Sequence, residues 1–256
     1  MNKKIFVVAG TQDGRELAGF LHENGYKVIA SVVSKYGEEL LKQYEGIEIN
    51  DKPLDSAGLT EFIAKNNISL LVDASHPYAA NASQNAMKAC HNTKIPYIRY
   101  ERKQTVLDYE KAYYVENYAE ASKKASELGK NIFLTTGSRN LEAFTASPYL
   151  KDCKLTCRVL PEPEVVLICR NLGFLPESII AMQGPFSKLM NLEMYKKYEA
   201  DVVITKNSGF LGGTDTKVEA AMELNLPLII IDRPKVQYDN VTDNYDDVLA
   251  FVRKEL

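Results

Sequence analysis

The chain has 256 residues, of which 45% are hydrophobic and 25% charged, and its formal net charge is −3 at pH 7. These values are typical of a globular protein with an ordinary core, and they exclude the global basic field that nucleic-acid binders show. The apolar run after Lys4 ends at Gly10 without a cleavage-like site, and no window approaches the roughly 18 apolar residues of a membrane span. We therefore expect a cytoplasmic protein without nucleic-acid or membrane partners.

Short apolar strands alternate with amphipathic helical segments along the chain. The first series of expected strands covers 4–10, 27–33, 69–75 and 96–101, with a possible short strand at 47–51. The second series covers 131–137, 154–160, 178–184, 202–208 and 227–233. Almost continuously apolar strands separated by helices indicate parallel sheets covered on both faces, and there are too many for one comfortable sheet. The pattern predicts an α/β protein with two Rossmann-like lobes, mainly parallel sheets and a cleft between the lobes.

The strand–helix rhythm lapses between 103 and 131, where the domain boundary is therefore expected. This gives an N-terminal nucleotide-binding lobe over 1–115 and a C-terminal lobe over 116–256 that contributes to the substrate cleft. A second irregular stretch, VQYDNVTDNY at 236–245, could cross between the lobes.

The stretch AGTQDGRELA (9–18) follows the first strand and opens a helix, which is the context of a dinucleotide-binding loop. The expected cofactor-binding residues here are Gly10, Thr11 and Gly14, although a structural turn is the alternative. The second strand ends at Ser34-Lys35 without the acidic residue that binds the ribose diol of NAD. A hydroxyl and a lysine suit a 2′-phosphate, which favours NADPH, with NADH possible. Lys35 as an ordinary surface lysine is the alternative.

The stretch VDASHPYAANAS (72–83) places Ser75, His76, Pro77 and Tyr78 between a strand and a helix. Parallel sheets bind ligands outside the carboxyl ends of their strands, so this junction is expected to form part of the site. Pro77 is expected to begin the helix. We predict that Ser75, His76 and Pro77 contact the cofactor; a structural role for His76 is the alternative.

Three loops of the second half follow strands in the same way. TTGSRNL (135–141) resembles an anion-binding loop at a helix start, with Ser138 as a helix cap in the alternative interpretation. MQGPFSKLMN (182–191) brings a glycine and a proline to a strand end, and TKNSGFLGGTDTK (205–217) combines glycines with lysines. Such glycines permit close approach of a ligand to the backbone.

The expected ligand-facing loops carry many cations and few acids, although the whole chain is acidic. This asymmetry predicts a polyanionic small-molecule ligand. The residues expected to bind the substrate are Arg99, Arg102, Gly137, Ser138, Arg139, Gln183, Gly184, Lys206, Ser208, Gly209, Gly213, Thr214, Lys217 and Arg233.

The metal-binding and nucleophile motifs of common enzymes are absent from the sequence. The four cysteines form no CxxC pair, and Cys157 alternates within an expected strand, so structural thiols are expected rather than zinc ligands. With three histidines, no HExxH, no GxSxG and no P-loop, no metal site is predicted.

In their order, these loops resemble the precorrin-6A reductase family of cobalamin biosynthesis. The resemblance rests on AGTQDGRELA, VDASHPYAANAS, IRYERK, FLTTGSRNL, RVLP, AMQGPFS, ITKNSGFLGGTDTKVEAA and IIIDRP, and runs from residue 5 to about residue 234. It implies an NAD(P)H-dependent oxidoreductase that reduces one macrocycle double bond of precorrin-6A or cobalt-precorrin-6A. The substrate would be a tetrapyrrole-derived ring with many carboxylates, which agrees with the basic loops.

Hydride transfer to such a ring leaves a proton to be delivered, and His76, Tyr78 and Lys206 are the candidate catalytic donors, with solvent as the alternative. Another nicotinamide-dependent reductase or epimerase is a competing interpretation, but Tyr109 and Tyr113 lack the lysine four residues on that the extended short-chain type requires. A non-enzymatic nucleotide sensor would leave the loop at 205–217 without a purpose. The cobalt content of the ring and the oligomeric state stay open.

Overall fold

A computed structural model of the protein describes residues 3–104, 108–207, 209 and 214–256. The chain divides into two compact units, Met1–Lys103 with Pro234–Leu256, and Gln104–Arg233. Within the described residues, each unit contains a six-stranded sheet whose paired strands are all parallel. The predicted pair of parallel Rossmann-like sheets is confirmed.

In the first unit, five strands alternate with four helices along the described N-terminal segment, and the C-terminal segment adds the sixth strand and a fifth helix. Its strands are β1 (Lys4–Val8), β2 (Lys27–Ser31), β3 (Glu48–Asn50), β4 (Ile68–Asp73), β5 (Tyr97–Tyr100) and β12 (Val241–Thr242). Its helices are α1 (Gln12–Glu23), α2 (Lys35–Leu41), α3 (Ser56–Asn66), α4 (Ala80–Thr93) and α10 (Tyr245–Glu255). The strand order β12-β5-β4-β1-β2-β3 is that of the Rossmann fold, in which the winding reverses between β1 and β4.

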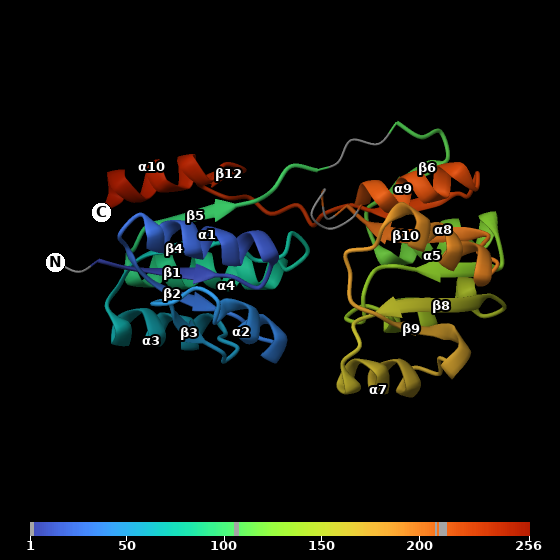
Figure 1. Ribbon diagram of the computed structural model, residues 1–256, viewed down its shortest axis with the longest axis horizontal. Helices are drawn as coiled ribbons and strands as arrows, with labels where there is room; N and C mark the ends of the chain where they lie inside the picture. Colours follow the sequence, from blue (N-terminus) through green and yellow to red (C-terminus); the bar gives the residue numbers. More distant parts are fainter. Residues whose placement is uncertain (1–2, 105–107, 208, 210–213) are drawn as a thin grey trace. The chain divides into compact units, whose positions relative to one another are not determined.

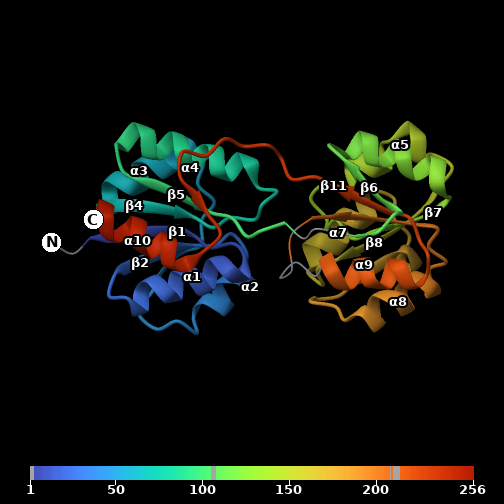
Figure 2. The ribbon, with the colours of Figure 1, turned by 90° about the horizontal axis from the view of Figure 1, so that it is seen from above.

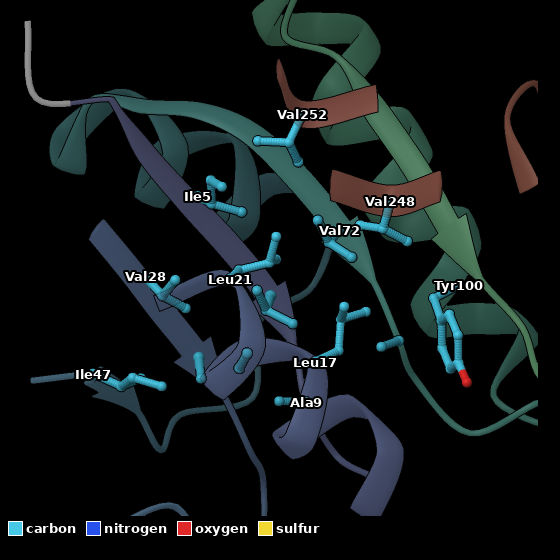
Figure 3. Close-up of a cluster of buried hydrophobic side chains, with 14 of the residues drawn as sticks. Ile5, Ala9, Leu17, Leu21, Val28, Ile47, Val72, Tyr100, Val248 and Val252 are labelled. Atoms are coloured by element: carbon cyan, nitrogen blue, oxygen red, sulfur yellow. The ribbon is translucent and has the colours of Figure 1, made fainter. Parts of the chain in front are cut away.

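Helices cover both faces of the first sheet: α1 and α10 lie on one face, and α3 and α4 on the other (Figures 1 and 2). The side chains of a strand alternate between the two faces, so Ile5 of β1 belongs to the first cluster and Phe6 to the second. Figure 3 shows Leu17 of α1 and Val248 and Val252 of α10 in the cluster with Ile5. The C-terminal helix therefore completes the core of the first unit.

The second unit has the same layered plan with a different strand order. Its strands are β6 (Ala112–Val115), β7 (Asn131–Leu134), β8 (Lys154–Val159), β9 (Ile179–Ala181), β10 (Val202–Lys206) and β11 (Leu228–Ile231). Its α-helices are α5 (Tyr118–Leu128), α6 (Glu142–Thr145), α7 (Pro163–Asn171), α8 (Lys188–Lys197) and α9 (Thr214–Glu223), with 3₁₀ turns at Pro148–Leu150 and Pro176–Ser178. The order β6-β11-β10-β7-β8-β9 reverses its winding between β7 and β10.

In the second unit, α5 lies on one face of the sheet and α8 and α9 lie together on the other (Figure 2). The face under α8 and α9 buries Phe133 of β7, Val203 of β10 and Ile230 of β11 against Tyr195 and Ala221 of the two helices. The ring of Tyr195 contacts Phe133 edge-on, with 5.1 Å between the centroids. This core holds β7 and β10, and hence the loops that follow them, in fixed register.

The predicted boundary between residues 115 and 116 requires two corrections. β6 pairs with β11 of the second unit, with Ala112 opposite Leu228, so the segment before 116 belongs to that unit. β12 pairs with β5 of the first unit, with Val241 opposite Arg99, so the C-terminal segment returns to the first unit. The chain crosses between the units after Lys103 and again after Arg233.

All four cysteines are free thiols, and Cys90, Cys157 and Cys169 are buried. Burial raises the pKa of the Cys90 thiol to about 12, which keeps it protonated near neutral pH.

None of the helices that the structure describes is long and apolar enough to cross a membrane.

Candidate functional site

The loops after β1 and β4 lie side by side at the carboxyl edge of the first sheet. The Ala74 backbone N–H donates to the Val8 carbonyl (3.2 Å), and the Thr11 hydroxyl donates to the Ala74 carbonyl (3.1 Å). Ligands of open α/β sheets bind where the winding reverses, which in this unit is between β1 and β4. The structure thus gathers at this place the predicted residues Gly10, Thr11, Gly14, Ser75, His76, Pro77 and Tyr78.

Gly10 and Gly14, the two glycines after β1, have different surroundings. A methyl group on Gly10 would meet nothing within 4 Å, so the backbone there faces open space. A methyl group on Gly14 would lie 2.9 Å from the Ala74 carbonyl oxygen and 3.1 Å from the Ala9 Cα. Gly14 thus lets α1 pack closely on the end of β4, whereas Gly10 leaves room beside the positive end of α1. A pyrophosphate fits this arrangement.

We predict opposite effects for alanine at these two glycines. Gly14→Ala is expected to lower the free energy of unfolding by about 1–3 kcal/mol, because its methyl group overpacks the backbone of β4. Gly10→Ala is expected to leave stability unchanged and to weaken nicotinamide-cofactor binding, because its methyl group occupies the open space. Urea unfolding and fluorescence titration with NADPH measure the two effects. Equal stability losses in both variants would contradict the division of roles.

The loop after β4 presents the His76 side chain in a defined orientation. The Tyr78 backbone N–H donates to Nδ1 of His76 (3.2 Å), and the Ala79 N–H donates to the His76 carbonyl (2.7 Å). A neutral His76 that accepts at Nδ1 carries its proton on Nε2. The helix α4 begins at Ala80, so the expectation that Pro77 begins it is wrong: 76–79 form a turn of their own, with Pro77 buried.

Arg99 lies inside the first unit, where the sequence led us to expect a substrate-facing residue. It is fully buried, and Asp73 stands directly opposite it on β4. Its guanidinium donates to the carboxylates of Asp73 (2.9 Å) and Glu101 (2.8 Å) and to the Ser75 hydroxyl (2.9 Å). The Tyr97 hydroxyl completes the cluster with a 2.8 Å bond to Asp73. Arg99 therefore holds the loop that carries His76.

Arg102 is likewise engaged within the first unit. Its Nη1 donates to both carboxylate oxygens of Asp13, at 3.0 Å each, and both side chains are largely buried. Asp13 lies in the first turn of α1, and the Tyr245 hydroxyl of α10 donates to its carbonyl (2.8 Å). A bare carboxylate there would repel a bound phosphate, so the ion pair with Arg102 keeps the positive end of α1 suitable for an anion.

Ser34 and Lys35 lie at the carboxyl end of β2, as expected. The Ser34 hydroxyl accepts the Gly37 N–H (3.0 Å) and caps α2, which Lys35 begins. The Lys35 side chain is exposed, and residues 32–37 contain no acid. Glu38, the acid in the first turn of α2, is paired with Lys42 (2.8 Å), and a lysine in this loop suits a phosphate better than a ribose diol.

The loop after β7 is attached to β10, across the point where the second sheet reverses its winding. The Thr135 N–H and hydroxyl both donate to the Ile204 carbonyl, at 2.9 and 3.1 Å. Gly137 has φ +77°, a conformation that favours glycine, and a methyl group there would meet nothing within 4 Å. The helix α6 begins only at Glu142, so the expected helix start at Ser138 is wrong and Ser138 does not cap α6.

Lys206 ends β10 among groups that lower its basicity. Burial, together with the positive charge of Arg139, lowers the pKa of Lys206 to about 8. Its Nζ lies 5.8 Å from the ring centre of Tyr118, whose hydroxyl accepts a 2.7 Å hydrogen bond from the Asn140 amide. Arg139 itself is exposed. No sequence pattern points to Tyr118, which begins α5, far from Lys206 along the chain.

The other expected substrate residues of the second unit fall into three groups. The Arg233 Nε donates to the Asn207 carbonyl (3.0 Å), so Arg233 supports the backbone after Lys206, and Lys217 is buried in α9. Gln183 is exposed at the end of β9 and bonds to the Gly184 carbonyl (3.2 Å), while Gly209 has φ +79°. The expectations for Ser208, Gly213 and the Thr214 side chain lie outside the described residues.

In the part of the chain that the structure describes, no group of three or more His, Cys, Asp or Glu side chains is arranged to hold a metal ion.

Comparisons with known proteins place this geometry among its relatives. The family model described as precorrin-6x reductase CbiJ/CobK matches residues 4–253. The chain is 41% identical to the cobalt-precorrin-6A reductase of Priestia megaterium, with 96% of each chain covered. It is 36% identical to the cobalt-precorrin-6A reductase of Methanothermobacter thermautotrophicus, covering 97% of this chain and 84% of the relative. A solved structure titled CobK precorrin-6A reductase superposes with a TM-score of 0.80 at 25% identity, over 99% of this chain and 97% of the other.

Proposed function

Because the chain belongs to the precorrin-6x reductase family, and is therefore an oxidoreductase of cobalamin biosynthesis, we propose that it reduces one ring double bond of cobalt-precorrin-6A. The relatives at 41% and 36% identity carry the cobalt-containing substrate in their names, whereas the solved structure titled for the metal-free substrate is 25% identical. The higher identity to the relatives named for the cobalt-containing substrate favours cobalt-precorrin-6A as the substrate. The cobalt then enters with the substrate.

The carboxyl edge of the first sheet is the proposed cofactor site. The open space at Gly10 and the free end of α1 suit the pyrophosphate, and Thr11, Ser75, His76 and Pro77 line the same edge. The exposed Lys35 with Ser34 favours NADPH over NADH, because a charge-assisted hydrogen bond to the 2′-phosphate contributes about 1.5–3 kcal/mol. When bound, the nicotinamide cofactor supplies a hydride.

The carboxyl edge of the second sheet is the proposed substrate site. Arg139 and Lys206 bring two cations together at the reversal point, and Gly137 exposes backbone beside them. Two like charges repel each other, and a carboxylate from the ring would interact favourably with both. The paired cations are the observation on which this assignment depends: burial and, in addition, the charge of Arg139 lower the pKa of Lys206.

The reduction also needs a proton on the atom next to the one that accepts the hydride. The Lys206 ammonium holds a proton that its lowered pKa allows it to give up near neutral pH, and His76 is the second proposed donor. Tyr78 is the third proposed donor. We favour Lys206, because its neighbours already shift it toward proton release.

The direct test supplies the ring and follows both partners of the reaction. With cobalt-precorrin-6A and NADPH, the amount of NADPH oxidised should equal the amount of ring reduced, which is measured from the change in the ring's visible spectrum. The metal-free ring should react more slowly. If folded protein oxidises no cofactor with either ring, the proposal fails.

Cofactor preference is tested by one substitution with a matched control. We expect kcat/KM for NADPH to exceed that for NADH by about tenfold to a hundredfold, and Lys35→Ala to remove most of that ratio. Lys27→Ala is the control, because Lys27 is also exposed but begins β2, at the end of that strand away from Lys35. An unchanged ratio in Lys35→Ala would assign the preference to another residue.

A further inference from the structure

Arg158 is a buried arginine at the carboxyl end of β8. It is 6% exposed, and its partner on β9 is Ile180. The register of β7 and β8 pairs Leu134 with Cys157, so Arg158 is level with Thr135, the start of the loop that carries Arg139. Arg158 therefore belongs to the same edge of the sheet as the proposed substrate site.

The groups that contact the Arg158 guanidinium are all neutral. Its Nη1 donates to the Asn191 side-chain oxygen (2.7 Å) and to the Met194 sulfur (3.4 Å). The Phe186 ring stacks on it, with 3.9 Å between the guanidinium carbon and the ring centre. The nearby Tyr195 hydroxyl is also neutral, because burial raises its pKa far above the physiological range.

Arg99, which is also buried, has a different environment. Arg99 contacts the carboxylates of Asp73 and Glu101, whereas Arg158 forms no ion pair with any side chain that the structure describes. Burial accordingly lowers the pKa of Arg158, although the guanidinium stays charged. A buried charge without a counter-charge costs several kcal/mol, which an incoming anion can offset.

Hydrogen bonds between α8, α9 and the loop after β9 fix the surroundings of Arg158. Asn191, fully buried in α8, donates to the Ser187 carbonyl (3.0 Å) and to the Thr216 hydroxyl (3.4 Å). The Thr216 hydroxyl of α9 in turn donates to the Phe186 carbonyl (3.0 Å). These bonds fix the loop after β9 and the start of α9 around the guanidinium, so its direction is set before a ligand binds.

Exposed apolar side chains lie on the loops next to this guanidinium. Leu160 follows Arg158 by two residues and is 47% exposed; Met182 follows β9 at 40%, and Met190 of α8 is 39% exposed. A flat apolar ring with acidic arms matches a buried cation bordered by such side chains.

We propose that Arg158 binds one carboxylate arm of the macrocycle while Leu160, Met182 and Met190 contact its apolar face. The inference rests on the proposed function and adds a residue that fixes the ring's orientation on the second unit. The carboxylate would supply the counter-charge that the neutral partners of Arg158 lack.

The test compares two corrins of the same framework, cobyrinic acid with free carboxylate arms and cobinamide with amidated arms. Binding is followed by absorbance titration. The wild-type protein should prefer the acid, and Arg158→Met should weaken acid binding by about tenfold to a hundredfold with little effect on the amide. Arg158→Lys should give an intermediate loss. Arg170→Met, at an exposed arginine of α7, is the control and should retain full preference.

A bracing role for Arg158 predicts a different pattern. If Arg158 only held the loop, Arg158→Met would lower the melting temperature of the free protein and weaken acid and amide binding equally. We expect the melting temperature to stay or rise, because a charge without a counter-ion is removed. Retained preference for the acid in Arg158→Met overturns the inference. Failure of the proposed function would instead appear as absence of ring reduction by the wild-type protein.

Discussion

Replacing Arg99 by methionine is expected to lower the free energy of unfolding by about 3–5 kcal/mol. The substitution preserves most of the side-chain volume but leaves the Asp73 carboxylate, which is fully buried, without its cation. Removing one partner of a buried ion pair leaves an uncompensated buried charge, which costs this much. The Ser75 hydroxyl and Glu101 lose their donor as well. Urea unfolding followed by circular dichroism measures the change.

The pH dependence of the same variant tests the electrostatic origin of the loss. Burial by itself raises the pKa of Asp73, but Arg99 and the hydrogen bonds from Ser83 and Ser75 outweigh it, so the net pKa lies below its usual value. The stability that Asp73 contributes is therefore present above the ordinary aspartate range and is lost as pH falls through the lowered value. In Arg99→Met burial dominates and raises the pKa of Asp73, so protonation at low pH relieves the unpaired buried charge. The difference in stability between the wild-type protein and the variant should therefore narrow as the pH falls.

Two further variants control this prediction. Adding Asp73→Asn to Arg99→Met should recover part of the lost stability, because the unpaired charge disappears. Lys188→Met removes a partner of Glu223 from an exposed ion pair, and we expect no measurable change in the urea midpoint. A loss in Arg99→Met that the second substitution does not reduce would assign the effect to packing and not to charge.

The layered fold was predictable from the sequence because its signal is local. Apolar strands alternating with helices specify two parallel sheets, and the polar residues after each strand specify where the ligand-facing loops lie. The pairing of strands that are far apart in the sequence leaves no such local pattern. β12 has two residues, Val241 and Thr242, which is too short for any periodicity, and its pairing with β5 makes the first unit discontinuous.

The roles of the arginines depend on strand register, which the sequence does not reveal. Arg99 has the same local signature as a ligand-binding residue, but Asp73 stands opposite it and neutralises it inside the fold. Arg158 carries only a weak sequence signal, a charged residue within the apolar strand LTCRVL. Its neutral surroundings come from α8 and from the loop after β9, so only the folded chain shows that its charge lacks a counter-ion.

Lys206→Gln is expected to lower kcat by about a hundredfold to ten-thousandfold, which is the usual contribution of a positioned proton donor. The pKa of Lys206 is lowered to about 8, so the ammonium form, which carries the proton, declines above that pH. The kcat/KM of the wild-type enzyme, which reports groups of the free protein, should therefore fall above about pH 8. In Lys206→Gln this alkaline decline should disappear along with most of the activity.

Arg139 supplies the control that separates proton donation from simple charge. Burial lowers the pKa of Lys206 most and Arg139 adds to the effect, so Arg139→Gln should raise that pKa and move the alkaline decline of kcat/KM to higher pH. Lys206→Arg keeps a positive charge but releases no proton near neutral pH, so it should restore substrate binding without restoring kcat. If Lys206→Gln kept kcat within about twofold, or Arg139→Gln left the profile in place, the proton would come from His76 or from water. His76→Gln would then distinguish those two sources.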